Sequence, residues 1–260
     1  MTGRLAPRSA LRPLEVVVRR LRAFNALSEA EQELLRNLAD RRERFASGEE
    51  LAAEGGPPGR PRFILSGWAC RQRVLPDGRR QIFGFLLPGD GFALNRPLAP
   101  ELTTIVALTA LETADAEQAL EAALGGRASG LARALLAAER AEQGLLLDHM
   151  VRLGRQTAYE RVAHFLLELQ HRLEVAGLGD SQRFPLPLTQ EILADALGLS
   201  IVHVNRTLQQ LRREGLIELR SGVAILLDRE QLGKIADYRL APPPSAAPSP
   251  RRVGLDSSPA

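Results

Sequence analysis

The segment that most constrains the fold is residues 193–215, which read LADALGLSIVHVNRTLQQLRREG. Two runs of helical periodicity are separated here by only three residues, Gly198-Leu199-Ser200. Glycine accepts the left-handed backbone of a sharp turn, and a hydroxyl side chain caps the helix that follows it. Thr189 and Ser200 are therefore the expected N-caps of two short helices joined by a tight turn.

The second of these helices is amphipathic. Its apolar face holds Val204, Leu208 and Leu211, which we expect to pack against Ile192, Ala196 and Leu199 of the preceding segment. The opposite face carries Ile201, Val202, Asn205, Arg206 and Gln209. This pattern is typical of a helix-turn-helix, although an ordinary corner between two helices also fits it.

The residues that follow favour the first interpretation. The sequence GLIELRSGVAILLD at 215–228 predicts a strand, a turn at Ser221-Gly222 and a second strand. A β-hairpin directly after the helix pair defines the winged form, in which the second helix enters the major groove. Basic residues outnumber acidic ones here, with Arg206, Arg212, Arg213 and Arg220 against Glu214 and Glu218.

Residues 44–114 have a different pattern, with short apolar runs separated by Gly, Pro and Asp. Pro76-Asp77-Gly78 is a hairpin signal, and residues 88–91 (PGDG) predict another turn. Several short strands at close spacing predict a small antiparallel barrel or roll.

Helical patterns flank this β-rich region. Residues 13–39 are helical in pattern, with a capping box at Ser28 and Glu31. A long run continues to Gly154 with an apolar stripe, which either faces a core or pairs with a second copy of the chain. The members of that stripe are Leu131, Leu135, Ala138 and Leu145. A second capping box, Thr157 to Glu160, places a hinge near Gly154.

These patterns together divide the chain into five parts. We expect a flexible arm over 1–12, a β-roll sensor domain over 13–125, a dimerisation helix over 126–154, a winged helix-turn-helix domain over 155–240 and a disordered Pro/Ser-rich tail over 241–260. The fold class is α+β.

Composition narrows the function. The formal charge of +3 is too small for general polyanion binding, so any basic patch is local. The single cysteine, Cys70, excludes an internal disulfide and a multi-cysteine metal site; it is either a buried strand residue or a redox-active thiol beside Arg71 and Arg73. Without a signal peptide core or a membrane-length apolar run, we expect a cytoplasmic protein.

The order of these parts resembles the CRP/FNR superfamily of bacterial transcription regulators. LTQEILADALGLSIVHVNRTLQQLRREGLIEL at 188–219 is similar to the C-terminal signature of that family, and the resemblance spans roughly residues 14–238. It implies a homodimer, held by the long helix, that binds double-stranded DNA at a palindromic site, and contact with RNA polymerase if the protein is an activator.

The resemblance also assigns roles to individual residues. Arg206 matches the family's guanine-reading arginine, whereas Val202 stands where many members carry a base-reading glutamate. Asn205 and His203 become additional candidate readers, although His203 could equally contact phosphate or solvent. The complete predicted DNA-binding set is Thr189, Gln190, Ser200, Val202, His203, Asn205, Arg206 and Gln209.

The sensor domain departs from the cyclic-nucleotide pattern of the family. Ala93-Leu94 stands roughly where a Gly-Glu pair belongs, and Glu101-Leu102 roughly where Arg-Ser belongs. A carboxylate in place of the guanidinium would repel a phosphate, so we expect no control by cyclic AMP, unless Arg79, Arg80 or Arg96 supplies a substitute cation. No cofactor is predicted and the effector is unknown, since the cysteines for an iron–sulfur cluster are missing. Haem bound through Cys70 or a histidine is the less favoured alternative, because all four histidines lie in predicted helices outside the β-roll.

These residues fit three classes of function unequally. A DNA-binding transcription regulator is the leading interpretation, and a sensor that acts mainly through a protein partner is the alternative. The sequence shows no metal triad, nucleophile elbow, phosphate loop or plausible Cys/His pairing, so we do not expect an enzyme.

Overall fold

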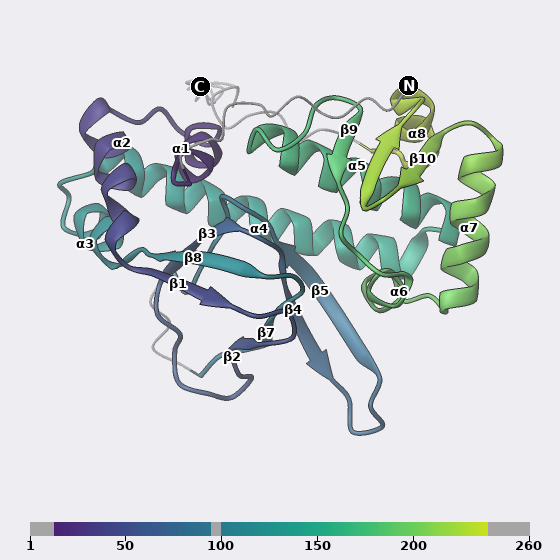
Figure 1. The fold of residues 1–260 in the computed structure, drawn as a ribbon, viewed down its shortest axis with the longest axis horizontal. Coiled ribbons are helices and arrows are strands. Elements are labelled where there is room, and N and C mark those ends of the chain that lie inside the picture. The colour runs from purple at the N-terminus through teal and green to yellow at the C-terminus, as the bar shows by residue number, and fades with distance from the viewer. Residues whose placement is uncertain (1–12, 95–99, 239–260) are drawn as a thin grey trace, which may run out of the picture.

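A computed structural model describes residues 13–94 and 100–238 (Figure 1). The predicted arm at 1–12 and the predicted tail at 241–260 lie outside these residues. The described chain contains no helix that is long and apolar enough to cross a membrane. Its elements follow the predicted order, in which short helices precede a β-roll, a long helix and a second helical domain.

The N-terminal helical region contains two helices, and the second begins at the predicted capping box. Helix α1 spans Glu15–Arg22 and α2 spans Glu29–Arg36, followed by the short 3₁₀ helix η1 (Asn37–Asp40). The break is set by Ser28, whose hydroxyl accepts a hydrogen bond from the Glu31 amide while the Glu31 carboxylate accepts one from the Ser28 amide. This capping box fixes a new helix start, so the chain turns between α1 and α2.

Two antiparallel four-stranded sheets form the β-roll. The first has the order β1 (Arg42–Phe45), β8 (Leu111–Asp115), β3 (Arg62–Ser66) and β6 (Gly91–Phe92). The second has the order β2 (Glu50–Ala52), β7 (Thr104–Ala107), β4 (Ala69–Val74) and β5 (Arg80–Leu86). Alternating side chains such as Ile64, Ile105 and Leu111 are buried in a core shared by the two sheets.

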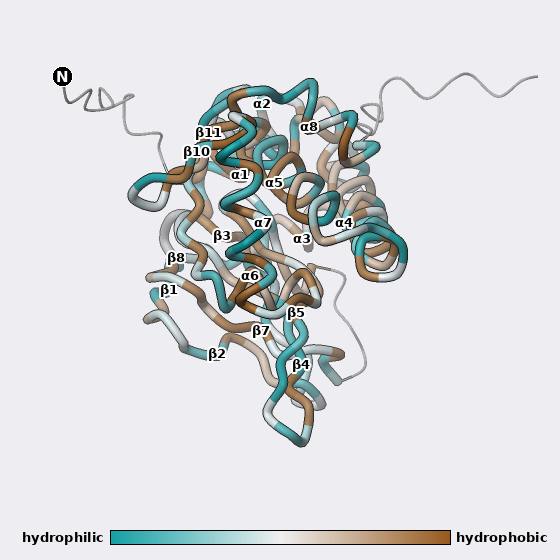
Figure 2. Tube along the Cα trace, turned by 90° about the vertical axis from the view of Figure 1, so that its right-hand side faces the viewer, coloured by the Kyte–Doolittle hydropathy of each residue, from teal (hydrophilic) through white to brown (hydrophobic). Residues whose placement is uncertain are grey.

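The predicted hairpin at Pro76-Asp77-Gly78 joins β4 to β5. Gly78 has a φ of 85°, a conformation that favours glycine, and its amide donates to the carbonyl of Leu75. In Figures 1 and 2 the tip of this hairpin projects away from the helical layer of the molecule.

After α3 (Glu117–Leu124) the chain enters α4 (Ser129–Arg155), the 27-residue helix that crosses the width of the molecule in Figure 1. Helix α4 ends at Arg155, and Gln156 is extended. Thr157 and Glu160 then form the predicted capping box and begin α5 (Ala158–Val175). The change of chain direction therefore lies just beyond the expected Gly154.

The C-terminal domain continues with β9 (Arg183–Pro185), α6 (Gln190–Leu197), α7 (Ile201–Arg213), β10 (Ile217–Arg220), β11 (Val223–Leu226) and α8 (Arg229–Ala236). The three strands form one antiparallel sheet in the order β10-β11-β9. Helix α5 packs against α7 and α8. The arrangement is a winged helix-turn-helix, as the sequence predicts.

One apolar core continues from the C-terminal domain into the β-roll. Phe165 and Leu169 of α5 share this core with Ile82 and Phe85 of β5 and with Trp68, which directly precedes β4. The Phe85 ring lies 5.4 Å from the Phe165 ring, centroid to centroid. The two domains of this chain are therefore packed against each other directly.

Candidate nucleic-acid interface

The turn between α6 and α7 has the predicted geometry. Gly198 adopts a φ of 61° and a ψ of 38°, the left-handed conformation that ends a helix, and the Leu199 amide donates to the carbonyl of Ala194. The Thr189 hydroxyl accepts from the Ile192 amide at 3.2 Å, and the Ser200 hydroxyl accepts from the His203 amide at 3.2 Å. Both expected caps are thus formed.

The apolar face of α7 is buried as the spacing predicts. Val204 and Leu211 have no exposed surface and Leu208 is 3% exposed. They belong to one core with Ala196, while Ile192 and Leu199 are partly buried against it. Burial of this face fixes which side of α7 turns outward.

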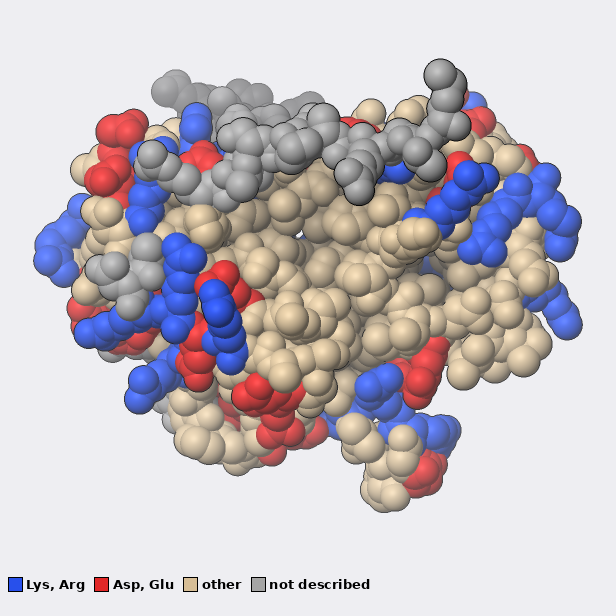
Figure 3. Space-filling view, in the orientation of Figure 1, with Lys and Arg blue, Asp and Glu red and all other residues tan. Residues whose placement is uncertain are grey.

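The outward face presents a mixed polar and apolar surface. His203, Arg206 and Gln209 are exposed, and Ile201 and Val202 are 50% and 66% exposed. Arg206 is exposed to solvent, so its guanidinium is open to an external acceptor. Basic side chains also gather along the edge of the molecule at α7 in Figure 3.

Two pairs of predicted contact residues lie together. The Gln190 side-chain amide donates to Asn205 Oδ1 at 3.4 Å, which links the start of α6 to the outward face of α7. His203 Nδ1 lies 3.1 Å from the Ser200 hydroxyl. The structure therefore brings the predicted DNA-contact residues of α6 and α7 onto one surface.

The wing is formed by β10 and β11. Ser221 and Gly222 at its tip have φ values of 49° and 74°. Arg220, which is exposed, is ion-paired with the partly buried Glu218 on the same strand. The wing thus carries a smaller free positive charge than a count of arginines suggests.

A structural residue that the sequence analysis did not identify fastens this surface to α4. The Arg161 guanidinium donates to the carbonyls of Gln156, Leu197 and Leu153, at 2.8, 3.0 and 2.9 Å. It therefore ties the end of α4 and the linker to the last residue of α6. These partners lie 5, 36 and 8 residues away in the chain, so no single spacing pattern marks them.

Helix α4 exposes a different apolar stripe from the predicted one. Leu131 has no exposed surface because it lies in the chain's own N-terminal core, and Leu135 is partly buried against the same core. Ala138 and Leu145 are half-buried. The exposed apolar side chains of α4 are Leu136, Leu146, Leu147, Met150 and Val151, with exposures from 46% to 67%.

The segment compared with the cyclic-nucleotide pattern carries no arginine at the compared positions. The Glu101 carboxylate accepts a hydrogen bond from the Gly59 amide at 2.8 Å, and Leu94 covers Gly91. Of the possible substitute cations, Arg79 pairs with Asp77 at the hairpin tip and Arg80 pairs with Asp195 of α6. Arg96 lies outside the described residues.

Cys70 lies buried in β4. Burial raises the pKa of the Cys70 thiol to about 12, and Arg71 and Arg73 pair instead with Glu142 and Glu54. Among the described residues no group of three His, Cys, Asp or Glu side chains could hold a metal ion. Cys70 is therefore a buried strand residue with a protonated thiol.

A β-roll, a long helix and a winged helix-turn-helix with an exposed polar recognition face define a class of DNA-binding regulator. Models of known families match the same two regions: a Crp-like helix-turn-helix domain at residues 160–235 and a cyclic nucleotide-binding domain at residues 42–118.

The chain is also similar in sequence to characterised transcription regulators. It is 38% identical to the nitrogen fixation regulation protein FixK of Bradyrhizobium diazoefficiens over 75% of this chain and 82% of that protein. It is 33% identical to the transcriptional activatory protein AadR of Rhodopseudomonas palustris, over 84% and 90% of the two chains.

A structural comparison agrees. The solved structure of FixK2 from Bradyrhizobium japonicum matches with a TM-score of 0.67 and 30% identity, covering 76% of this chain and 98% of that one. The chain therefore belongs to the CRP/FNR family of transcription regulators.

Proposed function

We propose that this regulator binds a palindromic DNA site as a homodimer, with one α7 helix in the major groove of each half-site. The carrying observation is the outward face of α7, where Arg206, His203 and Gln209 are exposed on a helix whose other face is buried. An arginine in this setting donates to both acceptors of a guanine edge.

The neighbouring side chains fall into two groups, one suited to contacting bases and the other to contacting phosphates. Val202, which is 66% exposed, can contact a thymine methyl group, and Asn205 can bind an adenine edge if it exchanges its hydrogen bond with Gln190. Thr189, Gln190 and Ser200 lie at helix starts, where hydroxyls and amides contact phosphate. The resulting half-site differs from one read by a glutamate at position 202.

The direct test is selection of bound sequences from a random DNA pool with the purified protein and no added effector. A two-fold symmetric motif with half-sites about one helical turn apart supports the proposal. Failure to enrich any motif contradicts DNA binding in the absence of an effector and favours action through a protein partner.

Arg206→Ala tests the reading of guanine. We expect a loss of about 1–3 kcal/mol of discrimination at one base pair per half-site, because a paired hydrogen bond to that base is removed. Arg44→Ala is the control, since it removes the same charge from an exposed strand of the β-roll. Equal discrimination by wild type and Arg206→Ala would contradict the assignment.

The homodimer is proposed to form through the exposed stripe on α4. Leu147 and Met150 are 60% and 63% exposed and lie on one side of the helix. Leu147→Asp should convert the dimer to a monomer in light-scattering measurements of mass. Leu124→Asp, at a 70% exposed position on α3, should leave the dimer unchanged.

We expect no control of this protein by cyclic AMP. Glu101 stands at the position compared with the family's phosphate-binding pair, and its carboxylate accepts a hydrogen bond from the Gly59 amide. This carboxylate would repel a phosphate. Adding cyclic AMP should therefore leave the affinity for the selected DNA unchanged. An increase of about tenfold in DNA affinity on adding cyclic AMP would show that another residue binds the phosphate.

A further inference from the structure

Two sets of polar contacts cross the boundary between the β-roll and the DNA-binding domain. In the first, Nε and Nη2 of Arg80 lie 2.7 and 2.6 Å from Oδ2 of Asp195, and the Gln81 side chain donates to the Asp195 carbonyl at 3.1 Å. Arg80 and Gln81 belong to β5, whereas Asp195 belongs to α6, the first helix of the helix-turn-helix. Both charged side chains are about three-quarters buried.

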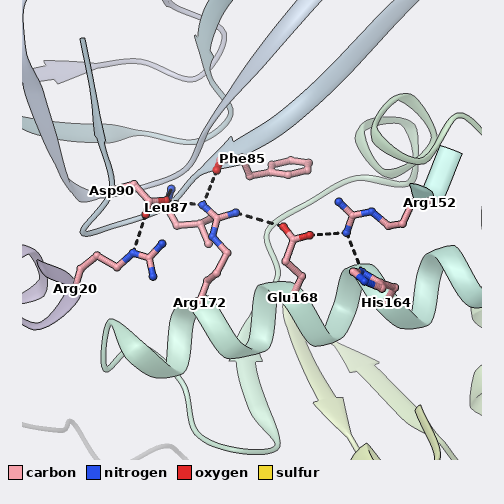
Figure 4. A network of polar contacts seen from close by, with 8 residues as sticks. All are labelled: Arg20, Phe85, Leu87, Asp90, Arg152, His164, Glu168 and Arg172. Carbon is pink, nitrogen blue, oxygen red and sulfur yellow. Dashed lines mark hydrogen bonds and ion pairs between the residues drawn. The ribbon is translucent and has the colours of Figure 1, made fainter. Parts of the chain in front are cut away.

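The second set is more deeply buried (Figure 4). Asp90, in the turn after β5, lies 2.6 Å from Nη2 of Arg172 on α5 and 3.0 Å from Nε of Arg20 on α1. The Arg172 guanidinium also donates to the carbonyl of Phe85 at 2.7 Å. None of the three charged side chains is more than 13% exposed.

The network continues from α5 to α4. Glu168 lies 3.5 Å from Nη1 of Arg172 and 2.5 Å from Nη1 of Arg152, and both contacts are buried. The same ion-pair chain thus joins the N-terminal helix, the β-roll, the DNA-binding domain and the long helix (Figure 4).

Such contacts resist a change in domain orientation. Separating a buried ion pair leaves an uncompensated charge, which costs far more than losing an exposed pair. A shift of α5 and α6 along the β-roll would break the contacts at Asp90 and Asp195 together. The clasp, defined as Arg80, Gln81, Asp90, Arg172 and Asp195, therefore favours one placement of the DNA-binding domain.

That placement leaves both proposed working surfaces uncovered. Val202 and Arg206 of α7 are exposed, as are Leu147 and Met150 of α4, while the clasp lies on other faces of these domains. The clasp therefore buries neither of the two proposed working surfaces.

We propose that Arg80 and Asp90 are positioning residues for DNA binding: through Asp195 and Arg172 they hold the recognition helix in the orientation that engages the operator. This inference rests on the proposed function. In this inference, polar contacts within the chain hold the two domains in one relative orientation. A bound effector could otherwise have this role.

The test exchanges the charges of the Arg80–Asp195 pair. It measures binding of the full-length protein to a labelled duplex that carries the selected motif. Arg80→Asp and Asp195→Arg should each weaken binding about tenfold, and the double exchange should recover most of the loss. Asp195→Arg is the sharper variant, because its added positive charge would by itself strengthen binding to DNA. Arg79→Asp is the matched control, since Arg79 is adjacent, pairs only within the hairpin tip and is 77% exposed.

The outcomes separate the two proposals. If wild type selects no DNA, the proposed function fails. If wild type binds but Asp195→Arg binds as well or better, and Arg80→Asp behaves like Arg79→Asp, the clasp is overturned.

A milder pair, Arg80→Ala and Asp195→Asn, serves if a charge exchange prevents folding. For these variants hydrogen exchange provides a readout without DNA. Faster exchange of the α6 amides, with β8 unchanged, supports the clasp, whereas unchanged α6 exchange together with unchanged DNA affinity refutes it.

Discussion

His149 allows the contribution of a single buried group to be measured through pH. Its ring lies 3.5 Å from the Gln81 side chain of β5, and only 5% of the residue is exposed. Burial lowers its pKa from 6.5 to about 4, assisted by the nearby positive charge of Arg152 and partly opposed by Glu168. The neutral imidazole is therefore the form that the fold accommodates.

The sign and size of the effect follow from that pKa. Because the folded value lies below the unfolded one, the stabilisation is fully present above pH 6.5 and is lost as the pH falls toward about 4. A separation of about 2.5 between the two pKa values corresponds to about 3 kcal/mol in the free energy of unfolding.

His149→Gln removes the titration while keeping a polar side chain of similar reach toward Gln81, which lies 3.5 Å from the His149 ring. We expect urea unfolding of wild type, measured across this pH range, to lose about 3 kcal/mol more than the variant. His203→Gln, on the exposed face of α7, should follow wild type. If wild type and His149→Gln lose stability in parallel, His149 is not a buried neutral group and the reasoning fails.

Further predictions concern the core and the turn. Cys70, with a pKa raised to about 12 by burial, should resist a thiol reagent at about pH 8 until the protein is unfolded; rapid labelling of the native protein would contradict its burial. Gly198→Ala should lower the free energy of unfolding by about 1–2 kcal/mol, since φ is 61° there; no loss in a urea titration would argue against the left-handed turn. Leu211→Ala should cost about 2–5 kcal/mol because Leu211 is fully buried, and a cost below that range would show that the core closes over the gap.

Local signals predicted the local structure well. The capping boxes at Ser28 and Thr157, the glycine turn at Gly198 and the amphipathic pattern of α7 all depend on residues within a few positions of one another. Their hydrogen bonds and faces are set by the backbone geometry of a single turn or helix. The same locality explains why the outward face carrying Asn205 and Arg206 could be named in advance.

The partner of the apolar stripe on α4 could not be predicted from local patterns. Periodicity identifies an apolar stripe on α4 but not its partner, and Leu131 proved to face the chain's own N-terminal core while Leu147 and Met150 stayed exposed. A helix of 27 residues passes several environments, so one stripe can serve an internal core at one end and an exposed surface at the other.

The sequence by itself determined the family, the order of the domains and the face of α7 that turns outward, because those follow from local patterns and from a signature contiguous in the chain. Only the tertiary structure decided that Arg80 meets Asp195, that Asp90 meets Arg172 and that Arg161 closes the hinge. The first two pairs join residues 115 and 82 positions apart. Which arginine pairs with which carboxylate depends on how whole domains pack. The sequence next to each arginine does not indicate its partner.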